Sequence, residues 1–338
     1  MVMKTNHAGY FRILGNVRDY PTRPAFRIEE VSPLYAWISS QWERSFKPFW
    51  FIQLVHDKYL ASTIVVIFYL MICKYGVSFM KKREELNLRK VIITWNLSLF
   101  LFNFIVVIKL IPVLLYTILN YTFNGLLIIP PIYTYAFGTP GLWVCLFIIS
   151  KYIELIDTFF LILRKKKITL LHWFHHATVL LYTWDTYSAE VSAGFIFIII
   201  NAFVHTIMYF YYFLATLYNK PLTWSIFVTV LQIFQMILGI TITLYCLYIT
   251  YAYKFSNYWD LRSIRKLQHK FTFDRGHYIN RTNLVCASLM YLSYIFLFVK
   301  YFCDRYVRAA PNQEQKQGQK QEQKQGQKQG QKQEQKQE

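Results

Sequence analysis

Residues 165–184 read KKKITLLHWFHHATVLLYTW, and this stretch carries the clearest structural and functional signal in the sequence. It places His172, His175 and His176 at positions i, i+3 and i+4 within an apolar run. On a helix, this spacing puts all three imidazoles on one face. Because ionisable groups are costly inside a bilayer, such a cluster in a membrane helix indicates a functional site.

The remainder of the chain has the composition of a helical membrane protein. Its 338 residues are 55% hydrophobic and 19% aromatic, and the mean hydropathy is +0.24. Several apolar runs reach about 20 residues, the length that a helix needs to cross a hydrocarbon core. The runs do not alternate with polar residues, which argues against a membrane β-barrel. The five cysteines form no CxxC pair, so neither a disulfide framework nor a zinc site is indicated.

We therefore predict an all-α polytopic membrane protein with seven transmembrane helices. The predicted spans are 59–80, 91–119, 141–163, 168–187, 192–218, 222–250 and 283–303. Together they form a membrane domain over residues 59–303. Residues 1–58 carry Trp37, Trp42 and Trp50 among charged residues, which is typical of an interfacial segment. Residues 304–338 are rich in glutamine and lysine, so we expect a disordered cytosolic tail.

The formal net charge is +19, and the basic loops set the expected orientation. Residues 81–90 and 164–167 lie on the same side as Lys220 and the C-terminal tail. The positive-inside rule makes this side cytosolic and the N-terminus lumenal. The basic loop 251–282 departs from the rule, because seven spans place it on the lumenal side. No basic soluble domain is present, which argues against nucleic-acid binding.

Polar residues recur at helical spacing in four consecutive spans. They are Lys151, Glu154, Asp157 and Thr158 in the third span, the three histidines in the fourth, Asn201, His205, Tyr209 and Tyr212 in the fifth, and Gln232 and Gln235 in the sixth. At a rise of about 1.5 Å per residue, all of them lie between the basic loops and the membrane midplane. Antiparallel neighbouring helices would gather them in one chamber. The tyrosines, the glutamines and the Lys151–Glu154 pair could equally serve to hold helices together.

Two kinds of chemistry fit a chamber lined by imidazoles. The histidines could hold iron or zinc, as in membrane desaturases and hydroxylases. Only four of the chain's eight histidines lie in the chamber, however, so we expect no metal site. Alternatively, an imidazole could attack a thioester or transfer a proton, and we favour this chemistry. A seven-span receptor or transporter is the alternative without catalysis.

Four motifs resemble the hallmark motifs of the ELO family, the very-long-chain fatty acid elongases, in the family's order and spacing. They are KYIELIDT (151–158), HWFHH (172–176), NAFVHTIMYFYY (201–212) and LQIFQ (231–235). The last span is also similar to the family's final helix, and the resemblance covers about residues 35–303. HxxHH alone is a weak signal, whereas its combination with the other three motifs is highly specific.

The resemblance implies a seven-helix enzyme of the endoplasmic reticulum membrane in which six helices surround an acyl tunnel. Its reaction would be a decarboxylative Claisen condensation. A long-chain acyl-CoA and malonyl-CoA would give 3-oxoacyl-CoA, CoA and CO2 without a cofactor. By this resemblance, His175 would attack the thioester and carry the acyl group, and His205 would assist. His172, His176 and Asn201 would orient these groups.

The resemblance also assigns substrate-binding residues. In the chamber they are Lys151, Glu154, Asp157, Tyr209, Tyr212, Gln232 and Gln235. At the cytosolic mouth, Arg164, Lys165, Lys166 and Lys167 would contact the CoA phosphates, where their positive charge suits an anionic substrate.

The same comparison bears on the chain preference and on the partners. Lys167 stands five residues before His172. A lysine at this position resembles the branch of the family that acts on long saturated and monounsaturated chains. The implied partners are acyl-CoA, malonyl-CoA, membrane lipid, and the 3-ketoacyl-CoA reductase, 3-hydroxyacyl-CoA dehydratase and enoyl-CoA reductase of the elongation cycle. The enzyme could also form a homo-oligomer.

Overall fold

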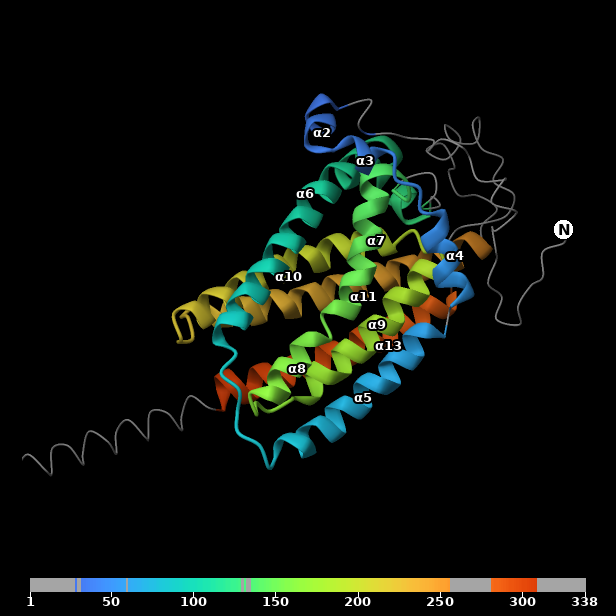
Figure 1. The fold of residues 1–338 in the computed structure, drawn as a ribbon. Helices are drawn as coiled ribbons and strands as arrows, with labels where there is room; N and C mark the ends of the chain where they lie inside the picture. The colour runs from blue at the N-terminus through green and yellow to red at the C-terminus, as the bar shows by residue number, and fades with distance from the viewer. Residues whose placement is uncertain are drawn as a thin grey trace, which may run out of the picture.

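The computed structural model describes residue 28, residues 32–58, 60–128, residue 131, residues 135–255 and residues 281–308. These residues form a bundle of helices and contain no strand, which confirms the all-α prediction for the described part of the chain (Figure 1). Most of the predicted loop 251–282, most of the predicted tail 304–338 and residues 1–27 of the predicted interfacial segment lie outside the described residues.

Five of the helices are long and apolar enough to cross a membrane, so the chain is a multi-pass membrane protein. They are α5 (Ala61–Met80), α6 (Arg89–Ile128), α10 (Gly194–Leu217), α11 (Ser225–Phe255) and α13 (Arg281–Phe302), the last of which continues into the π-helical turn η3 (Cys303–Val307). They correspond to the predicted spans 59–80, 91–119, 192–218, 222–250 and 283–303.

The predicted span 141–163 is not one helix, because α7 (Gly138–Ile153) and α8 (Ile156–Leu163) are separated at Glu154 and Leu155. Three amides near this break bond the carbonyl three residues earlier: Leu155 to Tyr152 at 3.3 Å, Asp157 to Glu154 at 3.2 Å and Thr158 to Leu155 at 3.1 Å. Such bonds wind the chain more tightly than an α-helix does. The expectation of one continuous helix is therefore corrected at Glu154, one of the predicted site residues.

The predicted span 168–187 appears as α9 (Leu170–Ser188). Thr169 caps its first turn, since the Thr169 hydroxyl accepts a hydrogen bond from the His172 amide at 3.2 Å. Three histidines and Asp185 lower the hydropathy of α9, so length and composition alone do not identify it as a span. The total of seven spans therefore stays a prediction.

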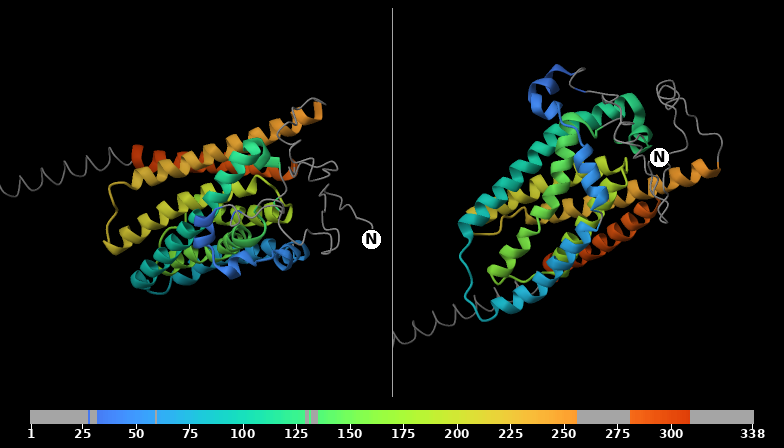
Figure 2. Two further views of the ribbon diagram at one scale, coloured as in Figure 1. Left: turned by 90° about the horizontal axis from the view of Figure 1, so that it is seen from above. Right: turned by 45° about the vertical axis from the view of Figure 1, so that its right-hand side comes forward.

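The helices differ in how far the rest of the bundle encloses them. Of the apolar stretch of α10, 61% is buried, whereas the value for α5 is 17%, so α10 is central and α5 peripheral. Seen from above, α11 and α13 lie on one side of the bundle and α5 lies on the other (Figure 2, left). Large apolar side chains on the outer face of α5, including Ile64, Ile67 and Phe68, are exposed, as expected for a surface that faces lipid.

Three short helices, α2 (Pro33–Ile38), α3 (Gln41–Arg44) and α4 (Phe49–Asp57), precede the long helices, and a polar cluster that we call the N-terminal clamp joins α3 to the bundle. Its centre is the Glu43 carboxylate, which accepts hydrogen bonds from Lys109 Nζ on α6 at 2.9 Å, from Trp143 Nε1 on α7 at 2.8 Å and from the Ser40 amide at 2.7 Å. Burial by itself raises the pKa of Glu43, but these bonds outweigh it and hold the pKa below its ordinary value.

Candidate active site

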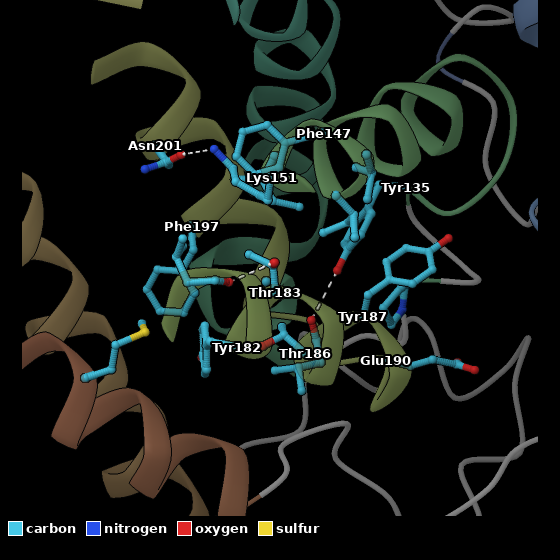
Figure 3. Close-up of a pocket in the computed structure, with 18 of the residues that line it drawn as sticks. Tyr135, Phe147, Lys151, Tyr182, Thr183, Thr186, Tyr187, Glu190, Phe197 and Asn201 are labelled. Carbon is cyan, nitrogen blue, oxygen red and sulfur yellow. Dashed lines mark hydrogen bonds between the residues drawn. The ribbon is translucent and has the colours of Figure 1, made fainter. Parts of the chain in front are cut away.

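Two hollows inside the bundle meet at one histidine. The outer cavity has about 1880 Å³ of empty space, its open mouth included, and is lined by the ends of α6, α8, α9, α10, α11 and α13. The inner pocket has about 1040 Å³ of empty space and is lined mostly by apolar and aromatic side chains (Figure 3). His175, Gln235 and Met236 line both hollows, so His175 lies where the more polar outer cavity joins the more apolar inner pocket.

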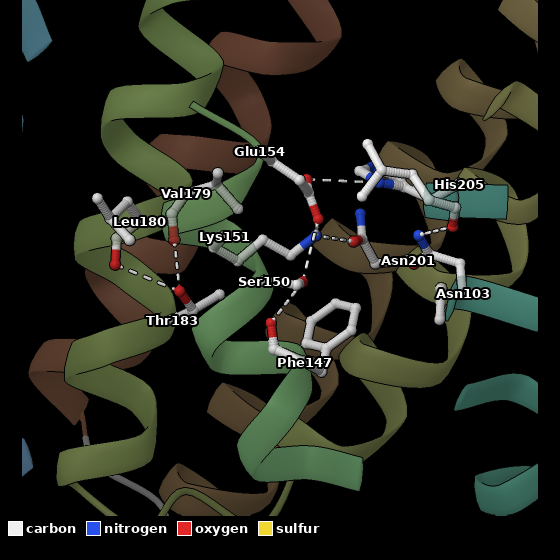
Figure 4. Close-up of polar contacts among 12 residues, drawn as sticks. Asn103, Phe147, Ser150, Lys151, Glu154, Val179, Leu180, Thr183, Asn201 and His205 are labelled. Carbon is white, nitrogen blue, oxygen red and sulfur yellow. Dashed lines mark hydrogen bonds and ion pairs between the residues drawn. The ribbon is translucent and has the colours of Figure 1, made fainter. Parts of the chain in front are cut away.

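A buried charge pair lies at the side of this junction (Figure 4). Lys151 Nζ donates hydrogen bonds to Glu154 Oε1 at 2.7 Å and to Asn201 Oδ1 at 3.1 Å. Ser150 Oγ donates to the same oxygen of Glu154 at 3.2 Å. Only 2% of the Lys151 side chain and 1% of the Glu154 side chain are exposed. Lys151 and Asn201 both line the inner pocket, so the hydrogen bond between them links α7 to α10 there.

His205 on α10 faces the second oxygen of the same carboxylate. Its Nδ1 lies 3.7 Å from Glu154 Oε2, which is beyond hydrogen-bond distance. Within the described residues this buried nitrogen has no hydrogen-bond partner. His205 also lines the outer cavity. A proton taken up by His205 would therefore be stabilised electrostatically by Glu154, as a catalytic base requires.

The three histidines of α9 lie against one another, as their spacing predicts. The ring centroids of His172 and His176 are 4.5 Å apart, and those of His175 and His176 are 5.4 Å apart. His172 Nε2 lies 2.9 Å from the Thr158 hydroxyl, which lies 2.9 Å from the Tyr69 hydroxyl of α5. This chain of hydrogen bonds fixes the orientation of the His172 ring, whereas His175 points to the junction of the hollows.

Tyr294 on α13 holds the backbone around His175. Its hydroxyl donates a hydrogen bond to the carbonyl oxygen of His175 at 3.3 Å and lies 2.6 Å from the Thr178 hydroxyl. The ring centroids of Tyr294 and His175 are 5.1 Å apart. The position of His175 thus depends on the packing of α9 against α13.

Asp157 lies on the outer cavity and is held by two donors from other helices. Trp95 Nε1 of α6 donates to Asp157 Oδ1 at 2.6 Å, and the Tyr209 hydroxyl of α10 donates to Oδ2 at 3.0 Å. Both carboxylate oxygens are therefore occupied, which makes Asp157 a better candidate for holding the wall of the cavity than for moving a proton.

The remaining predicted site residues divide between two places. Tyr212, Gln232, Gln235, Arg164 and Lys167 line the outer cavity. Gln232 Nε2 donates to Met208 Sδ at 3.1 Å. Lys165 and Lys166 instead line a separate hollow between α5 and the turn that joins α8 to α9. The outer cavity therefore contains two of the four basic residues predicted at its mouth.

The sequence did not single out several residues that contact the site. Trp95 and Tyr294 lie in apolar spans, where aromatic residues are common, and their partners are distant in the sequence. Arg305, at the end of the last span, also lines the outer cavity. A cation at that position could have been noticed from the sequence, because it faces the same side as the basic loop 164–167.

The donor geometry bears on metal binding. Within the described part of the chain, no group of three or more histidine, cysteine, aspartate or glutamate side chains is arranged to hold a metal ion. His172 is hydrogen-bonded to Thr158, and Glu154 is hydrogen-bonded to Lys151. The arrangement suits an imidazole nucleophile or base at the mouth of an apolar pocket, with a buried cation beside it.

Comparisons with known proteins match this chain to a family and to individual relatives. Residues 54–314 match the family described as "ELO: GNS1/SUR4 family". The chain is 32% identical over 269 residues to "Very long chain fatty acid elongase 6" of Gallus gallus, covering 79% of this chain and 92% of the relative. It is 30% identical over 302 residues to "Fatty acid elongase 3" of Trypanosoma cruzi (81% and 94%) and 29% identical over 287 residues to "Very long chain fatty acid elongase 3" of Homo sapiens (82% and 93%).

Proposed function

Because the chain belongs to the ELO (GNS1/SUR4) family, we propose that it is the condensing enzyme of fatty acid elongation. It joins a long-chain acyl-CoA to malonyl-CoA and forms 3-oxoacyl-CoA, CoA and CO2. The relatives it matches are named fatty acid elongases, and the reaction follows from the motif resemblance described above.

The observation that supports this proposal most strongly is the position of His175 between the two hollows. A fatty acyl chain favours the apolar inner pocket, where its methylene groups leave water. The phosphates and nucleotide of CoA stay in the polar outer cavity. The thioester then lies at the junction, within reach of the His175 imidazole.

The first step is acyl transfer to His175. An imidazole nitrogen attacks the thioester carbonyl, a carbon–nitrogen bond forms, and the carbon–sulfur bond breaks. The CoA thiolate takes the proton that the imidazole loses, so the products are an acyl-imidazole and free CoA. Lys151, paired with Glu154 beside the junction, favours negative charge on the thioester oxygen as the tetrahedral intermediate forms.

The second step is condensation. Malonyl-CoA loses CO2 as the bond to its carboxylate breaks, which leaves an enolate on the remaining acetyl-CoA unit. The enolate carbon attacks the acyl-imidazole, the acyl–nitrogen bond breaks, and 3-oxoacyl-CoA forms. The departing imidazolate takes up one proton that comes from solvent, which regenerates the neutral imidazole of His175. His205 is the residue placed to relay this proton, since within the described residues its Nδ1 has no hydrogen-bond partner and faces Glu154.

Basic side chains at the mouth supply the binding site for the CoA phosphates. Arg164, Lys167 and Arg305 line the outer cavity. A smaller hollow beside it is lined by Arg89, Arg164 and Lys220, so Arg164 belongs to both. These cations come from α6, η3 and the loops after α8 and α10, and they match the several negative charges of CoA.

The proposed orientation in the membrane follows from the positive-inside rule, and the proposed organelle follows from the family resemblance. The basic mouth faces the cytosol, the N-terminus is lumenal and the C-terminus cytosolic, with seven spans in the endoplasmic reticulum membrane. Lys167 and its neighbours support a preference for long saturated and monounsaturated acyl chains. The product requires the reductases and the dehydratase of the elongation cycle as partners.

The proposal is tested with purified protein, acyl-CoA and labelled malonyl-CoA. The wild type forms 3-oxoacyl-CoA, and His175→Ala loses this activity while it keeps the wild-type melting temperature to within a few degrees. Leu170→Ala is the matched control on the same helix, because Leu170 is 51% exposed and lines neither hollow. Full turnover by His175→Ala, or dependence of wild-type turnover on iron and oxygen, would contradict the proposal.

A further inference from the structure

A groove outside the catalytic hollows carries five lysines. It lies between α5 and the turn from α8 to α9, and we call it the lysine groove. Its lysines are Lys74, Lys81, Lys165, Lys166 and Lys167, and its floor is formed by apolar side chains that include Val77, Ile162 and Trp173. We propose that the lysine groove binds the headgroup of an anionic membrane phospholipid, with the acyl chains along the outer face of α5.

The five lysines give the groove a positive charge, which favours the binding of an anion. None of the described residues that line it is acidic. Within the described part of the chain, no ion pair joins any of the five lysines to a carboxylate. Glu84 and Glu85 follow in the same loop as Lys81, but both are exposed and neither lines the groove. A headgroup phosphate would therefore meet several cations at once without displacing a carboxylate.

The surroundings of the groove favour a lipid over a soluble anion. α5 is the most peripheral of the candidate spans and lines neither the outer cavity nor the inner pocket in the described part of the chain. The groove lies where the apolar helix α5 ends in Lys81, which is the depth of the phospholipid headgroups. Below this level the outer face of α5 exposes large apolar side chains that can accept acyl chains.

The turn at the rim of the groove has a defined geometry. Lys165 is left-handed, with φ of 51°. Its amide bonds the Ile162 carbonyl at 3.0 Å, and the Lys166 amide bonds the Leu161 carbonyl at 2.8 Å. These two bonds end α8 in a Schellman motif, at a position where glycine would be favoured on backbone grounds. A lysine at this position brings charge to the groove at the expense of backbone stability.

One residue connects the groove with the catalytic side. Lys167 lines both the lysine groove and the outer cavity. The lipid site and the proposed CoA site are neighbours that share one cation.

The first test counts lipids bound to the protein in nanodiscs of phosphatidylcholine with or without phosphatidylserine, by native mass spectrometry. Lys74→Gln/Lys81→Gln should lower the affinity for phosphatidylserine roughly tenfold or more, since each lysine near the surface contributes about fivefold. Lys82→Gln/Lys90→Gln removes the same charge from the same side of the bundle, outside the groove, and should change the affinity by less than about twofold. Equal losses in both variants, or no loss in the first, would overturn the inference.

Two soluble competitors distinguish the possible sources of the anion. Inorganic phosphate and CoA should both fail to displace phosphatidylserine, because neither brings acyl chains to α5. Displacement by CoA would assign the groove to the nucleotide and overturn the inference, and so would displacement by inorganic phosphate.

A kinetic measurement on the first variant separates the lipid site from the substrate site. Lys74→Gln/Lys81→Gln should lose phosphatidylserine binding and keep the wild-type KM for acyl-CoA, because neither lysine lines the outer cavity. Retained lipid binding with a raised KM would place these lysines on CoA and overturn the inference. Lipid counting needs no turnover, so the inference can stand even where the proposed condensation fails its own test.

Discussion

Two buried lysine–glutamate pairs lie in the described part of the chain, and they differ in how completely their atoms are hydrogen-bonded. In the N-terminal clamp, Glu43 accepts hydrogen bonds from Lys109, Trp143 and the Ser40 amide, and the cluster ties α3 to α6 and α7. In the candidate active site, the Lys151–Glu154 pair lies beside a hollow, and one Glu154 oxygen faces an imidazole nitrogen of His205 that has no hydrogen-bond partner among the residues that the structure describes.

This difference separates structural from chemical use of the same two residue types. A closed cluster positions helices, because removing its central carboxylate leaves the buried donors around it without their acceptor. A pair beside an imidazole nitrogen without a hydrogen-bond partner, at the wall of a cavity, can still bind a substrate group or stabilise a proton. The four experiments below break or sharpen this contrast, from the largest expected effect to the smallest.

Glu43→Ala should lower the free energy of unfolding by about 3–5 kcal/mol, because it leaves the Lys109 ammonium buried without its counter-ion. Turnover per folded molecule should stay at the wild-type level, since Glu43 lines neither hollow. Thermal unfolding followed by tryptophan fluorescence, together with kcat of the folded fraction, measures both. A loss of kcat without a loss of stability would show that the clamp takes part in catalysis.

Glu154→Gln should have the opposite effect to Glu43→Ala, with a large loss of turnover and a smaller loss of stability. Turnover should fall about 100-fold or more, because the neutral amide no longer balances Lys151 or stabilises a protonated His205. The loss of stability should be smaller than that of Glu43→Ala, since a cavity beside the pair lets water reach the uncompensated charge. Steady-state kinetics and a thermal melt of the same preparation give the two values. Wild-type turnover in this variant would remove Glu154 from the proposed chemistry.

Two indole-to-carboxylate hydrogen bonds offer a matched pair of smaller changes. Trp143→Phe removes the donor to Glu43 and should cost about 1.5–3 kcal/mol of stability with turnover unchanged. Trp95→Phe removes the donor to Asp157, which keeps its bond from Tyr209, and should lower turnover by about tenfold or less. The contrast fails if both substitutions change stability and turnover in the same proportion.

The pH dependence of stability should carry the smallest signal. The pKa of Glu43 is held below its ordinary value of 4.5, so the carboxylate contributes stability above that value. This contribution is lost as the pH falls below 4.5 toward the lower pKa of the folded state. Glu43→Gln should be less stable at neutral pH and should lose less on acidification. Parallel acid curves for the wild type and the variant would contradict this account of the clamp.

Much of the fold follows from hydropathy and helical periodicity. Five long apolar segments are helices, and the i, i+3 and i+4 spacing of the α9 histidines places their rings in contact. Periodicity assumes ideal helices, so it could not show the tightened turn at Glu154 that separates α7 from α8. That turn depends on hydrogen bonds three residues apart, which leave no mark on the spacing of side chains.

The partners of the site residues were beyond the reach of one sequence. Asp157 meets Trp95 from 62 residues away, and Thr158 meets Tyr69 from 89 residues away. Lys109 carries a signal that the sequence analysis did not use, because it is an ionisable residue within a predicted span and such residues are rarely without a partner. Its partner Glu43 lies in the short helix α3, where the interfacial tryptophans were the more prominent feature.

The measurement that tests the central claim most directly is the intact mass of the purified protein after incubation with acyl-CoA alone. If His175 is the nucleophile at the junction of the two hollows, the wild type gains the mass of one acyl group and releases CoA. Fragmentation then places the group on His175, and His175→Ala gains no mass. An adduct that persists in His175→Ala, or a wild type that forms 3-oxoacyl-CoA but never carries an acyl group, would contradict the account.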